Sequence, residues 1–333
     1  MNAASRTSIL RASQSRRFLL CRPRGGLNDV LCRIGECWRY AEKFDRTLII
    51  DTRKSELRDH FSNFFEPKDK APNVIFDASE DDLEFLNELA CFPTEIRGQL
   101  HRLDVRLKAT PRLKPITNLA LPDFDFSKNY QEDVLAYEQW GGGSLSFGLM
   151  DKLRLSPKIR PMVLDRVRQF DGKYYAVHVR NTDLKTNYKD FFSKIVPEVS
   201  GKRLLVCSDD AAVIEYARNF FRSSEILTSS EIPDLGGKPL HIYGDRKKSN
   251  IDTIVDLIAL GKSQKLFFAN VTEGRASGFS GLAGHLFTNK YLLDGLLESP
   301  RIDFAVIKWR VKKYRRGLRH YLRQRMSQSL KGS

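Results

Sequence analysis

The residues best suited to chemistry lie at the end of one apolar segment, where Tyr174–Val179 leads into the pattern His-x-Arg-x-x-Asp, formed by His178, Arg180 and Asp183. An apolar, β-branched run is typical of a buried strand, and in open α/β sheets ligands bind just outside the carboxyl ends of the strands. Arginine suits a phosphate there, because its planar guanidinium donates hydrogen bonds in pairs and keeps its charge. The segment therefore predicts a site for a nucleotide or nucleotide sugar, with a plain surface pair of Arg180 and Asp183 as the alternative.

A second candidate site is the loop Gly25-Gly26-Leu27-Asn28, which follows a predicted strand at Arg17–Arg22. Two glycines let backbone amides approach a ligand, and a helix with Asn28 as its N-cap would offer its positive end to an anion. The third glycine of the dinucleotide-binding fingerprint is missing, so a plain tight turn is an equally good interpretation.

Two acidic residues, Asp209 and Asp210, follow the predicted strand Arg203–Ser208. One of them is expected to cap the next helix. The other could accept hydrogen bonds from ribose hydroxyls or a guanine edge, or it could orient Arg180. No metal is expected, because no further acidic partners accompany the pair.

Two more candidates lie later in the chain. Ser280 precedes a helix of small apolar residues, where it would either cap the helix or, with exposed amides, hold a phosphate. The spacing around it is not that of a serine nucleophile elbow. Asp256 lies in the strongly apolar segment Ile251–Lys262, where an unpaired buried carboxylate is costly. It should therefore form an ion pair within the domain or accept from a ligand, such as the two donors of a guanine edge.

Strands and helices that alternate along the chain must position these residues. A strand, the glycine loop, a helix from Asp29 and a strand at Thr47–Asp51 form a βαβ unit, whose strands should be parallel. Residues 55–150 are less regular, with a strand expected at Asn73–Asp77 and a helix at Glu80–Ala90. The second half alternates cleanly, which predicts a doubly wound parallel sheet. Its expected strands are Tyr174–Arg180, Arg203–Ser208, Glu225–Thr228, Leu240–Gly244 and Lys265–Asn270, and its expected helices are Tyr188–Val196, Asp210–Phe221, Ile251–Lys262 and Gly281–Thr288.

The composition fits a soluble globular protein with room for two domains: the chain has 333 residues, of which 41% are hydrophobic and 29% are charged. No apolar run approaches the roughly 20 residues of a membrane-spanning helix. The five cysteines are odd in number and have no paired spacing, which indicates reduced, buried thiols in a cytosolic setting. Residues 1–16 are rich in Ser and Arg and predict a flexible basic tail.

Much of the net charge of +15 lies at the end of the chain, since residues 304–333 contain four Lys and six Arg and no acidic residue, which leaves +5 for the rest. Apolar residues recur there at helical spacing, which predicts a basic amphipathic helix. It could bind an anionic membrane surface through residues 304–325, or it could pack on the protein with a solvated basic face. No nucleic-acid-binding module accompanies it, so no specific nucleic acid is expected.

Taken together, in this order and spacing, the motifs resemble the GDP-fucose-dependent fucosyltransferases, and most of all the branch of the α1,6-fucosyltransferases and rhizobial nodulation fucosyltransferases. The resemblance covers about residues 17–290 and is strong in the second half. The matching motifs are Gly25–Asn28, Arg46-Thr47-Leu48, His178–Asp183, Ser208-Asp209-Asp210, Asp256 on its apolar helix, and Ser277–Ser280.

The resemblance implies a GT-B fold, in which two Rossmann-like doubly wound parallel-sheet domains face a cleft. We expect a flexible tail over 1–16, an acceptor domain over 17–155, a nucleotide-sugar-binding domain over 156–300 and a basic C-terminal helix or tail over 301–333. The resemblance also implies an inverting transfer of fucose, or a related sugar, from a GDP-sugar to a hydroxyl of a glycan or lipid-linked oligosaccharide, with no metal and no cofactor.

The roles of the family's residues carry over to matching positions of this chain. Arg180 would bind the β-phosphate and stabilise the charge on the departing GDP. Ser280 and the amides after Phe279 would hold the phosphates, and His178 and Asp256 would hold the guanine. The other substrate-binding residues would be Gly25, Gly26, Asn28, Asp209 and Asp210.

The chain departs from the family at Asn181, where many relatives have a second Arg, and at Tyr188, where the α1,6 branch has a carboxylate. The general base is therefore open, with Asp183 and Asp190 as candidates by position. The departures indicate a different acceptor and leave the sugar on GDP open. The alternatives are a transferase with another nucleotide donor and a non-catalytic sugar- or membrane-binding relative. The expected location is the cytoplasm, at the inner face of the membrane if the basic helix binds lipid.

Overall fold

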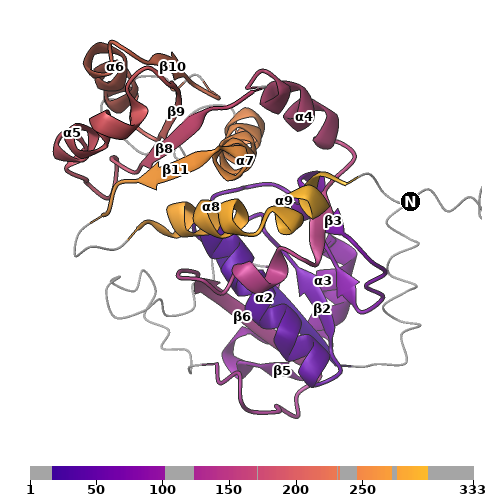
Figure 1. Ribbon diagram of the computed structural model, residues 1–333. Coiled ribbons are helices and arrows are strands. Elements are labelled where there is room, and N and C mark those ends of the chain that lie inside the picture. Colours follow the sequence, from indigo (N-terminus) through magenta and orange to yellow (C-terminus); the bar gives the residue numbers. More distant parts are fainter. Residues whose placement is uncertain are drawn as a thin grey trace, which may run out of the picture. The chain divides into compact units, whose positions relative to one another are not determined.

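The computed structural model describes residues 17–101, 124–170, 172–230, 232, 246–271 and 276–298 (Figure 1). All of these residues belong to one compact unit, Met1–Glu298. The predicted tails, 1–16 and 301–333, and the predicted strand Leu240–Gly244 lie outside the described residues.

A parallel sheet in the strand order β4-β2-β1-β6-β5 carries the first half of the chain. Its strands are β1 (Phe18–Arg24), β2 (Thr47–Ile50), β4 (Val74–Ile75), β5 (Cys91–Phe92) and β6 (Val134–Trp140). The central strand β1 tolerates Pro23, because β2 pairs with β1 only as far as Cys21 and loses no hydrogen bond to the proline.

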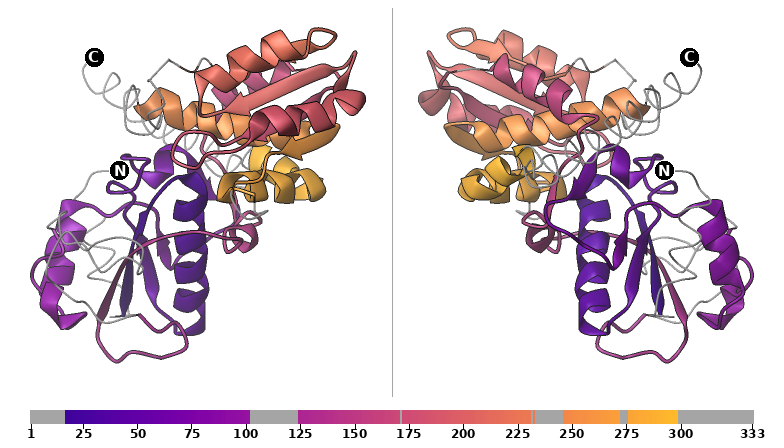
Figure 2. Two further views of the ribbon diagram at one scale, coloured as in Figure 1. Left: turned by 90° about the vertical axis from the view of Figure 1, so that its left-hand side faces the viewer. Right: turned by 90° about the vertical axis from the view of Figure 1, so that its right-hand side faces the viewer.

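Helices cover both faces of this first sheet. Side chains alternate along a strand, so Leu19 and Cys21 of β1 pack in one core with α2 (Leu27–Lys43). Phe18 and Leu20 point the other way and pack with α3 (Glu80–Asn87). Figure 2 shows α2 and α3 on opposite sides of the strands.

A second parallel sheet, in the order β10-β9-β8-β11, carries the second half. Val177 and Val206 face the core of α5 and α6, whereas Ala176 and Leu205 face the core of α7 and α8. The strands are β8 (Tyr175–Val179), β9 (Arg203–Ser208), β10 (Glu225–Leu227) and β11 (Lys265–Phe268). The helices are α5 (Tyr188–Val199), α6 (Ala211–Phe220), α7 (Arg246–Lys262) and α8 (Gly278–Thr288).

Shorter elements complete the described chain. Strand β3 pairs antiparallel with β7, outside the two parallel sheets. These elements are β3 (Phe65–Pro67), β7 (Leu153–Leu155), α4 (Arg160–Arg168), α9 (Lys290–Leu297) and the 3₁₀ turns η1 (Phe61–Asn63), η2 (Thr94–Ile96) and η3 (Phe147–Leu149). Within the described ranges, every helix is too short or too polar to cross a membrane. All five cysteines are buried free thiols, as the sequence indicated.

The two parallel sheets confirm the predicted α/β fold class, but several expected element boundaries were wrong. Helix α2 begins two residues earlier than predicted, with Gly26 rather than Asn28 at its N-cap. Helix α8 begins three residues earlier, because Ser277 rather than Ser280 caps it. Strand β6 was missed, although it pairs with β1 along that strand's whole length. The division into domains at residue 155 stays a prediction.

Gly141 illustrates how tightly the loop after β6 packs on α2. A Cβ atom added at Gly141 would lie 2.0 Å from the backbone oxygen of Asp29, in the first turn of α2. One of the two backbone segments must therefore move if residue 141 carries a side chain.

We predict that Gly141→Ala lowers the free energy of unfolding by about 1–3 kcal/mol, the usual cost of overpacking. Gly148→Ala is the matched control, because the nearest atom to its new Cβ would be the end of the flexible Arg39 side chain, at 3.5 Å. Urea unfolding measures both variants. Equal midpoints for Gly141→Ala and the parent protein would contradict the close packing.

Candidate functional site

The predicted site residues of the second half gather at the carboxyl ends of parallel strands. Arg180 follows β8 directly, Asp209 follows β9 directly, and Ser229 comes two residues after β10. Because β8, β9 and β10 are neighbours in one parallel sheet, their ends lie along the same edge. In open parallel sheets, this is the edge at which ligands bind.

Arg180 is held by two carboxylates. Its NH1 lies 3.0 Å from Oδ2 of Asp209, and its Nε donates to Oδ1 of Asp183 at 2.8 Å. The side chain of Asp183 is 46% exposed, whereas that of Asp209 is only 11% exposed. The predicted pair of Arg180 and Asp183 therefore exists. A second and less exposed carboxylate, that of Asp209, holds the same guanidinium.

Asp209 also fixes the loop that carries Arg180. Its Oδ1 accepts from the backbone N–H of Asn181 at 2.7 Å, and its Oδ2 accepts from the hydroxyl of Thr182. These hydrogen bonds join the carboxylate of Asp209 to both the guanidinium and the backbone of the loop after β8. The sequence left several roles open for Asp209 and Asp210. In the structure, Asp209 orients Arg180.

Asp210 has the other role that the sequence predicted, that of helix cap. Its Oδ1 accepts from the backbone N–H of Ala212 at 3.0 Å and caps α6. Its Oδ2 accepts from the side-chain amide of Asn181 at 2.7 Å. Asn181, which departs from the family pattern, thus ties the loop after β8 to the start of α6.

His178 lies inside the site rather than at its surface. Its Nδ1 is 2.7 Å from the hydroxyl oxygen of Ser280, which in turn is 2.9 Å from the hydroxyl oxygen of Ser277. The ring of Phe279 packs beside the imidazole, with the ring centroids 5.0 Å apart. Burial lowers the pKa of His178 to about 4, so the ring is neutral at physiological pH. The β8 end and the start of α8 are therefore joined by neutral hydrogen-bonding groups.

Asp256 is on α7 and accepts a hydrogen bond from the hydroxyl of Ser229 through its Oδ1. The ion pair that the sequence allowed for Asp256 does not occur among the described residues, since Arg166 pairs with Asp252 instead. Burial raises the pKa of Asp256 to about 7, although the hydrogen bond from Ser229 favours the charged form. Asp256 therefore changes its charge in the physiological range.

The glycine loop of the first half adjoins the start of α8. Asn28 donates through its side-chain amide to the backbone oxygen of Gly143 at 3.2 Å, and its Oδ1 accepts from the hydroxyl of Ser146 at 2.7 Å. A Cβ added at Gly278 would lie 2.5 Å from Nδ2 of Asn28. Gly25, at φ +89°, and Gly26 lead into this contact. The structure thus brings the predicted glycine loop and the predicted α8 segment together.

Asp183 and Asp190, the two residues proposed as general base, have different partners in the structure. Asp183 pairs with Arg180. Asp190 is exposed in the first turn of α5, where Asn187 caps the helix and donates to its carboxylate. Tyr188 packs its ring against Phe192 rather than pointing a polar group at Arg180. Local hydrogen bonds therefore account for Asp190 without a substrate.

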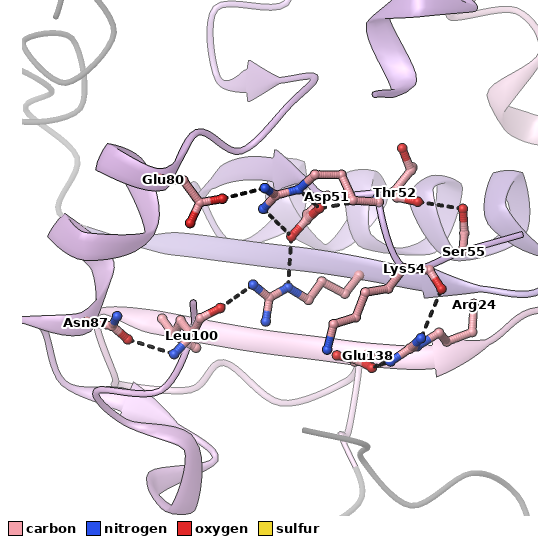
Figure 3. A network of polar contacts seen from close by, with 11 residues as sticks. Arg24, Asp51, Thr52, Lys54, Ser55, Glu80, Asn87, Leu100 and Glu138 are labelled. Atoms are coloured by element: carbon pink, nitrogen blue, oxygen red, sulfur yellow. Dashed lines mark hydrogen bonds and ion pairs between the residues drawn. The ribbon is translucent and has the colours of Figure 1, made fainter. Parts of the chain in front are cut away.

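A network of charged side chains lies at the carboxyl ends of β1, β2 and β6 (Figure 3). Asp51 accepts from Nε of Arg22 at 3.0 Å and from Nε of Arg53 at 2.9 Å, and Arg24 donates through Nε to Glu138 at 2.8 Å. Burial alone would raise the pKa of Asp51, but the two neighbouring guanidinium groups outweigh it and lower that pKa. This network was not predicted from the sequence, because its members come from three separate segments.

The same network supports the glycine loop. Ser55 donates to the backbone oxygen of Thr52 at 2.7 Å, which shapes the turn after Asp51. The backbone N–H of Glu56 then donates to the backbone oxygen of Gly25 at 3.0 Å. The chain after β2 thereby holds the loop before α2 in place.

Comparisons with known proteins point to one group of solved structures. No family model matches the chain, and no curated protein matches it. A structure of the NodZ α-1,6-fucosyltransferase soaked with GDP-fucose is 18% identical, covers 81% of this chain and 92% of its own, and has a TM-score of 0.54. A structure of the fucosyltransferase NodZ from Bradyrhizobium is also 18% identical, covering 80% and 91%, with a TM-score of 0.52.

A third structure comes from a plant. A mutant of Arabidopsis thaliana FUT1 in complex with GDP is 11% identical, covers 86% of this chain and 73% of its own, and has a TM-score of 0.50. At such low identity the likeness concerns the fold. The protein thus has the two-sheet GT-B type of fold found in solved fucosyltransferases, as its motifs led us to expect.

Proposed function

We propose that this protein is an inverting glycosyltransferase that moves fucose, or a related sugar, from a GDP-sugar to a hydroxyl of a glycan acceptor. The observation that carries the proposal is the double anchoring of Arg180 at the carboxyl end of β8. A guanidinium held in advance at a strand end is what a departing diphosphate requires. The fold supports the proposal, because structures with the same fold come from fucosyltransferases soaked or crystallised with GDP-fucose or GDP.

The diphosphate would lie between Arg180 and the start of α8. The amides after Phe279 were expected to hold the phosphates, but the N–H of Ser280 donates to the hydroxyl of Ser277 at 3.1 Å, and the N–H of Gly281 donates to the backbone oxygen of Ser277 at 2.9 Å. The anion would therefore meet the two earlier amides of α8, those of Gly278 and Phe279, since the first amides of a helix lack partners within the helix.

Ser280 stands in the first turn of α8, and the hydrogen bond to neutral His178 fixes its hydroxyl. His178 and Phe279 would border the nucleotide, and Asp256 would accept from the guanine edge. Asp209 and Asp210 would act by holding the loop of Arg180.

In the transfer step, the acceptor hydroxyl gives its proton to a base, its oxygen forms a bond to the anomeric carbon, and the bond from that carbon to the phosphate oxygen breaks. The electron pair goes to the β-phosphate, where Arg180 stabilises the new charge. Arg180 and the α8 amides would supply the positive charge that a divalent metal supplies in other transferases. We therefore propose that the reaction needs neither metal nor cofactor.

The acceptor would be a glycan or a lipid-linked oligosaccharide, bound by a domain over residues 17–155, while residues 156–300 would bind the donor. The glycine loop with Gly25, Gly26 and Asn28 would then meet the acceptor side of the sugar. An anionic membrane surface would suit residues 304–325, and the protein would act at the cytoplasmic face of the membrane. No specific nucleic acid takes part in this proposal.

A nucleotide titration tests the proposal. We expect GDP to raise the thermal unfolding midpoint, since a ligand that binds only the folded state stabilises it, and UDP to leave the midpoint unchanged. The rise of the thermal unfolding midpoint with GDP should persist in the presence of EDTA. A shift with UDP but not with GDP would contradict the GDP-sugar assignment, and a strict requirement for Mn²⁺ would contradict the metal-free mechanism.

Arg180→Ala should reduce the release of GDP from GDP-fucose at least a hundredfold, the scale of losing one preorganised charge-stabilising donor. The fold should survive, because Asp209 still accepts from Asn181 and Thr182. Arg168→Ala is the matched control, because Arg168 forms an exposed pair with Asp165 on α4. Release rates and thermal unfolding are measured for both variants, and undiminished release by Arg180→Ala would refute the assignment.

The affinity for GDP should depend on pH through Asp256. The free protein holds this carboxyl protonated below about pH 7, so binding the guanine donors must then expel a proton. Affinity should fall by up to about tenfold per pH unit below pH 7. In Asp256→Asn the affinity should be at least about tenfold weaker at pH 8, since a hydrogen bond to a charged group is lost.

Calorimetry between pH 5.5 and 8 checks this expectation. The terminal phosphate of GDP itself titrates near pH 6, but it does so with both proteins. The difference between the parent protein and Asp256→Asn therefore isolates Asp256. Parallel curves for the two proteins would show that Asp256 does not contact the base.

A further inference from the structure

A transfer to a hydroxyl needs a group that takes up the hydroxyl proton, and the titratable groups next to Arg180 are already engaged. Asp183 is ion-paired with Arg180, and Asp209 accepts from Arg180 and the loop behind it. Asp210 caps α6. His178 directs Nδ1 at Ser280, and its pKa of about 4 makes it a weak base.

Asp29, in the first turn of α2, is engaged far less. Among the described residues its side chain accepts one hydrogen bond, from the backbone N–H of Gly26 to Oδ2 at 3.2 Å, and it forms no ion pair. A Cβ on Gly25 would lie 2.4 Å from the same Oδ2, so the carboxylate folds back over the glycine loop. The side chain is only half-buried, and Oδ1 is left to accept from a substrate.

Two observations place Asp29 near the phosphate-binding groups. The preceding residue, Asn28, touches the start of α8 at Gly278, and α2 and α8 are in contact. The charges of Arg180 and Asp183 both act on the carboxyl of Asp29. Asp29 thus comes from the first half of the chain and lies within electrostatic reach of Arg180 and Asp183, which belong to the second half.

We propose that Asp29 is the general base, which takes the proton from the acceptor hydroxyl as its oxygen bonds to the anomeric carbon. The proposal rests on the proposed transferase function. The proton moves to Oδ1 of Asp29, the acceptor oxygen forms the new glycosidic bond, and the bond to the phosphate breaks with its electron pair on GDP. The proton then leaves to water when the product departs.

The electrostatic surroundings suit this role. Burial raises the pKa of the Asp29 carboxyl, while the charges of Arg180 and Arg33 lower it and that of Asp183 raises it. A base is effective when its pKa lies closer to the working pH than that of an ordinary carboxylate. Asp29 can support the start of α2 and also act as a base. The N–H of Gly26 orients its Oδ2 and leaves its Oδ1 for the proton.

Hydrolysis of GDP-fucose tests the proposal without knowledge of the acceptor, because water then takes the acceptor's place and must lose a proton in the same way. Asp29→Asn keeps an oxygen for the N–H of Gly26 but cannot accept the proton. We expect kcat to fall at least a hundredfold, the usual contribution of a general base, with KM for GDP-fucose and the affinity for GDP within twofold.

Two further readouts separate a base from a helix cap. The rate of the parent protein should fall as pH drops through the pKa of Asp29, and this acid limb should be absent in Asp29→Asn. Formate should raise the rate of Asp29→Ala, whereas chloride at the same ionic strength should not. Glu36→Gln is the control, because Glu36 lies two turns along α2 and pairs with Arg33.

The outcomes distinguish this inference from the function on which it rests. Near-parental hydrolysis by Asp29→Asn would overturn the assignment of the base. So would a loss of GDP affinity as large as the loss of rate, because that would show a structural role. If the parent protein binds UDP instead of GDP, or releases no GDP from GDP-fucose, the proposed function itself is wrong.

Discussion

The site depends on one carboxylate, that of Asp209. It accepts from the guanidinium of Arg180, from the backbone N–H of Asn181 and from the hydroxyl of Thr182. Only 11% of the Asp209 side chain is exposed, and a charge that is largely removed from water is costly without such donors. The loop after β8 and the loop after β9 are therefore fixed together, and the direction of Arg180 follows from that junction.

The second constraint is the close approach of α2 and α8 at their first turns. A side chain at Gly278 would collide with the amide of Asn28, and a side chain at Gly141 would collide with the backbone of Asp29. Glycine at both places lets the first turns of α2 and α8, and the loop after β6, pack closely together. Such an arrangement holds its dipoles before a ligand arrives, which is the condition for strong stabilisation of a developing charge.

The sequence predicted most clearly what depends on local pattern. Apolar β-branched runs gave β8 and β9 within a residue of their observed ends, because both strands are buried on two faces. Helix starts were less predictable, since Asn28 and Ser280 look like good N-caps but have side-chain partners elsewhere. Strand β6 was missed because it lies in a stretch without the alternation that marked the second half.

Most contacts between residues distant in sequence were not predicted, although the orientation of Arg180 by Asp209 was among the roles that the sequence allowed. His178 meets Ser280 across 102 positions, and Asp256 meets Ser229 across 27. The short-range signal at Asp29 is only that of an acidic residue in a first helical turn, which any helix start favours. Its approach to Arg180 depends on the packing of α2 on α8. The sequence pattern instead indicated Asp183 and Asp190, which are close to Arg180 along the chain.

The unequal exposure of the two partners of Arg180 explains how one arginine can be both held and available. Asp183 is 46% exposed, so water solvates its carboxylate readily once the pair opens, and an exposed ion pair is worth little. Asp209 is 11% exposed and has other donors that keep it in place. Under the proposed function, an incoming phosphate would compete with Asp183 and leave the contact with Asp209 intact. Asp209 would then set the geometry of the guanidinium. Asp183 would occupy the phosphate position until the donor binds, and breaking its exposed ion pair would cost little free energy.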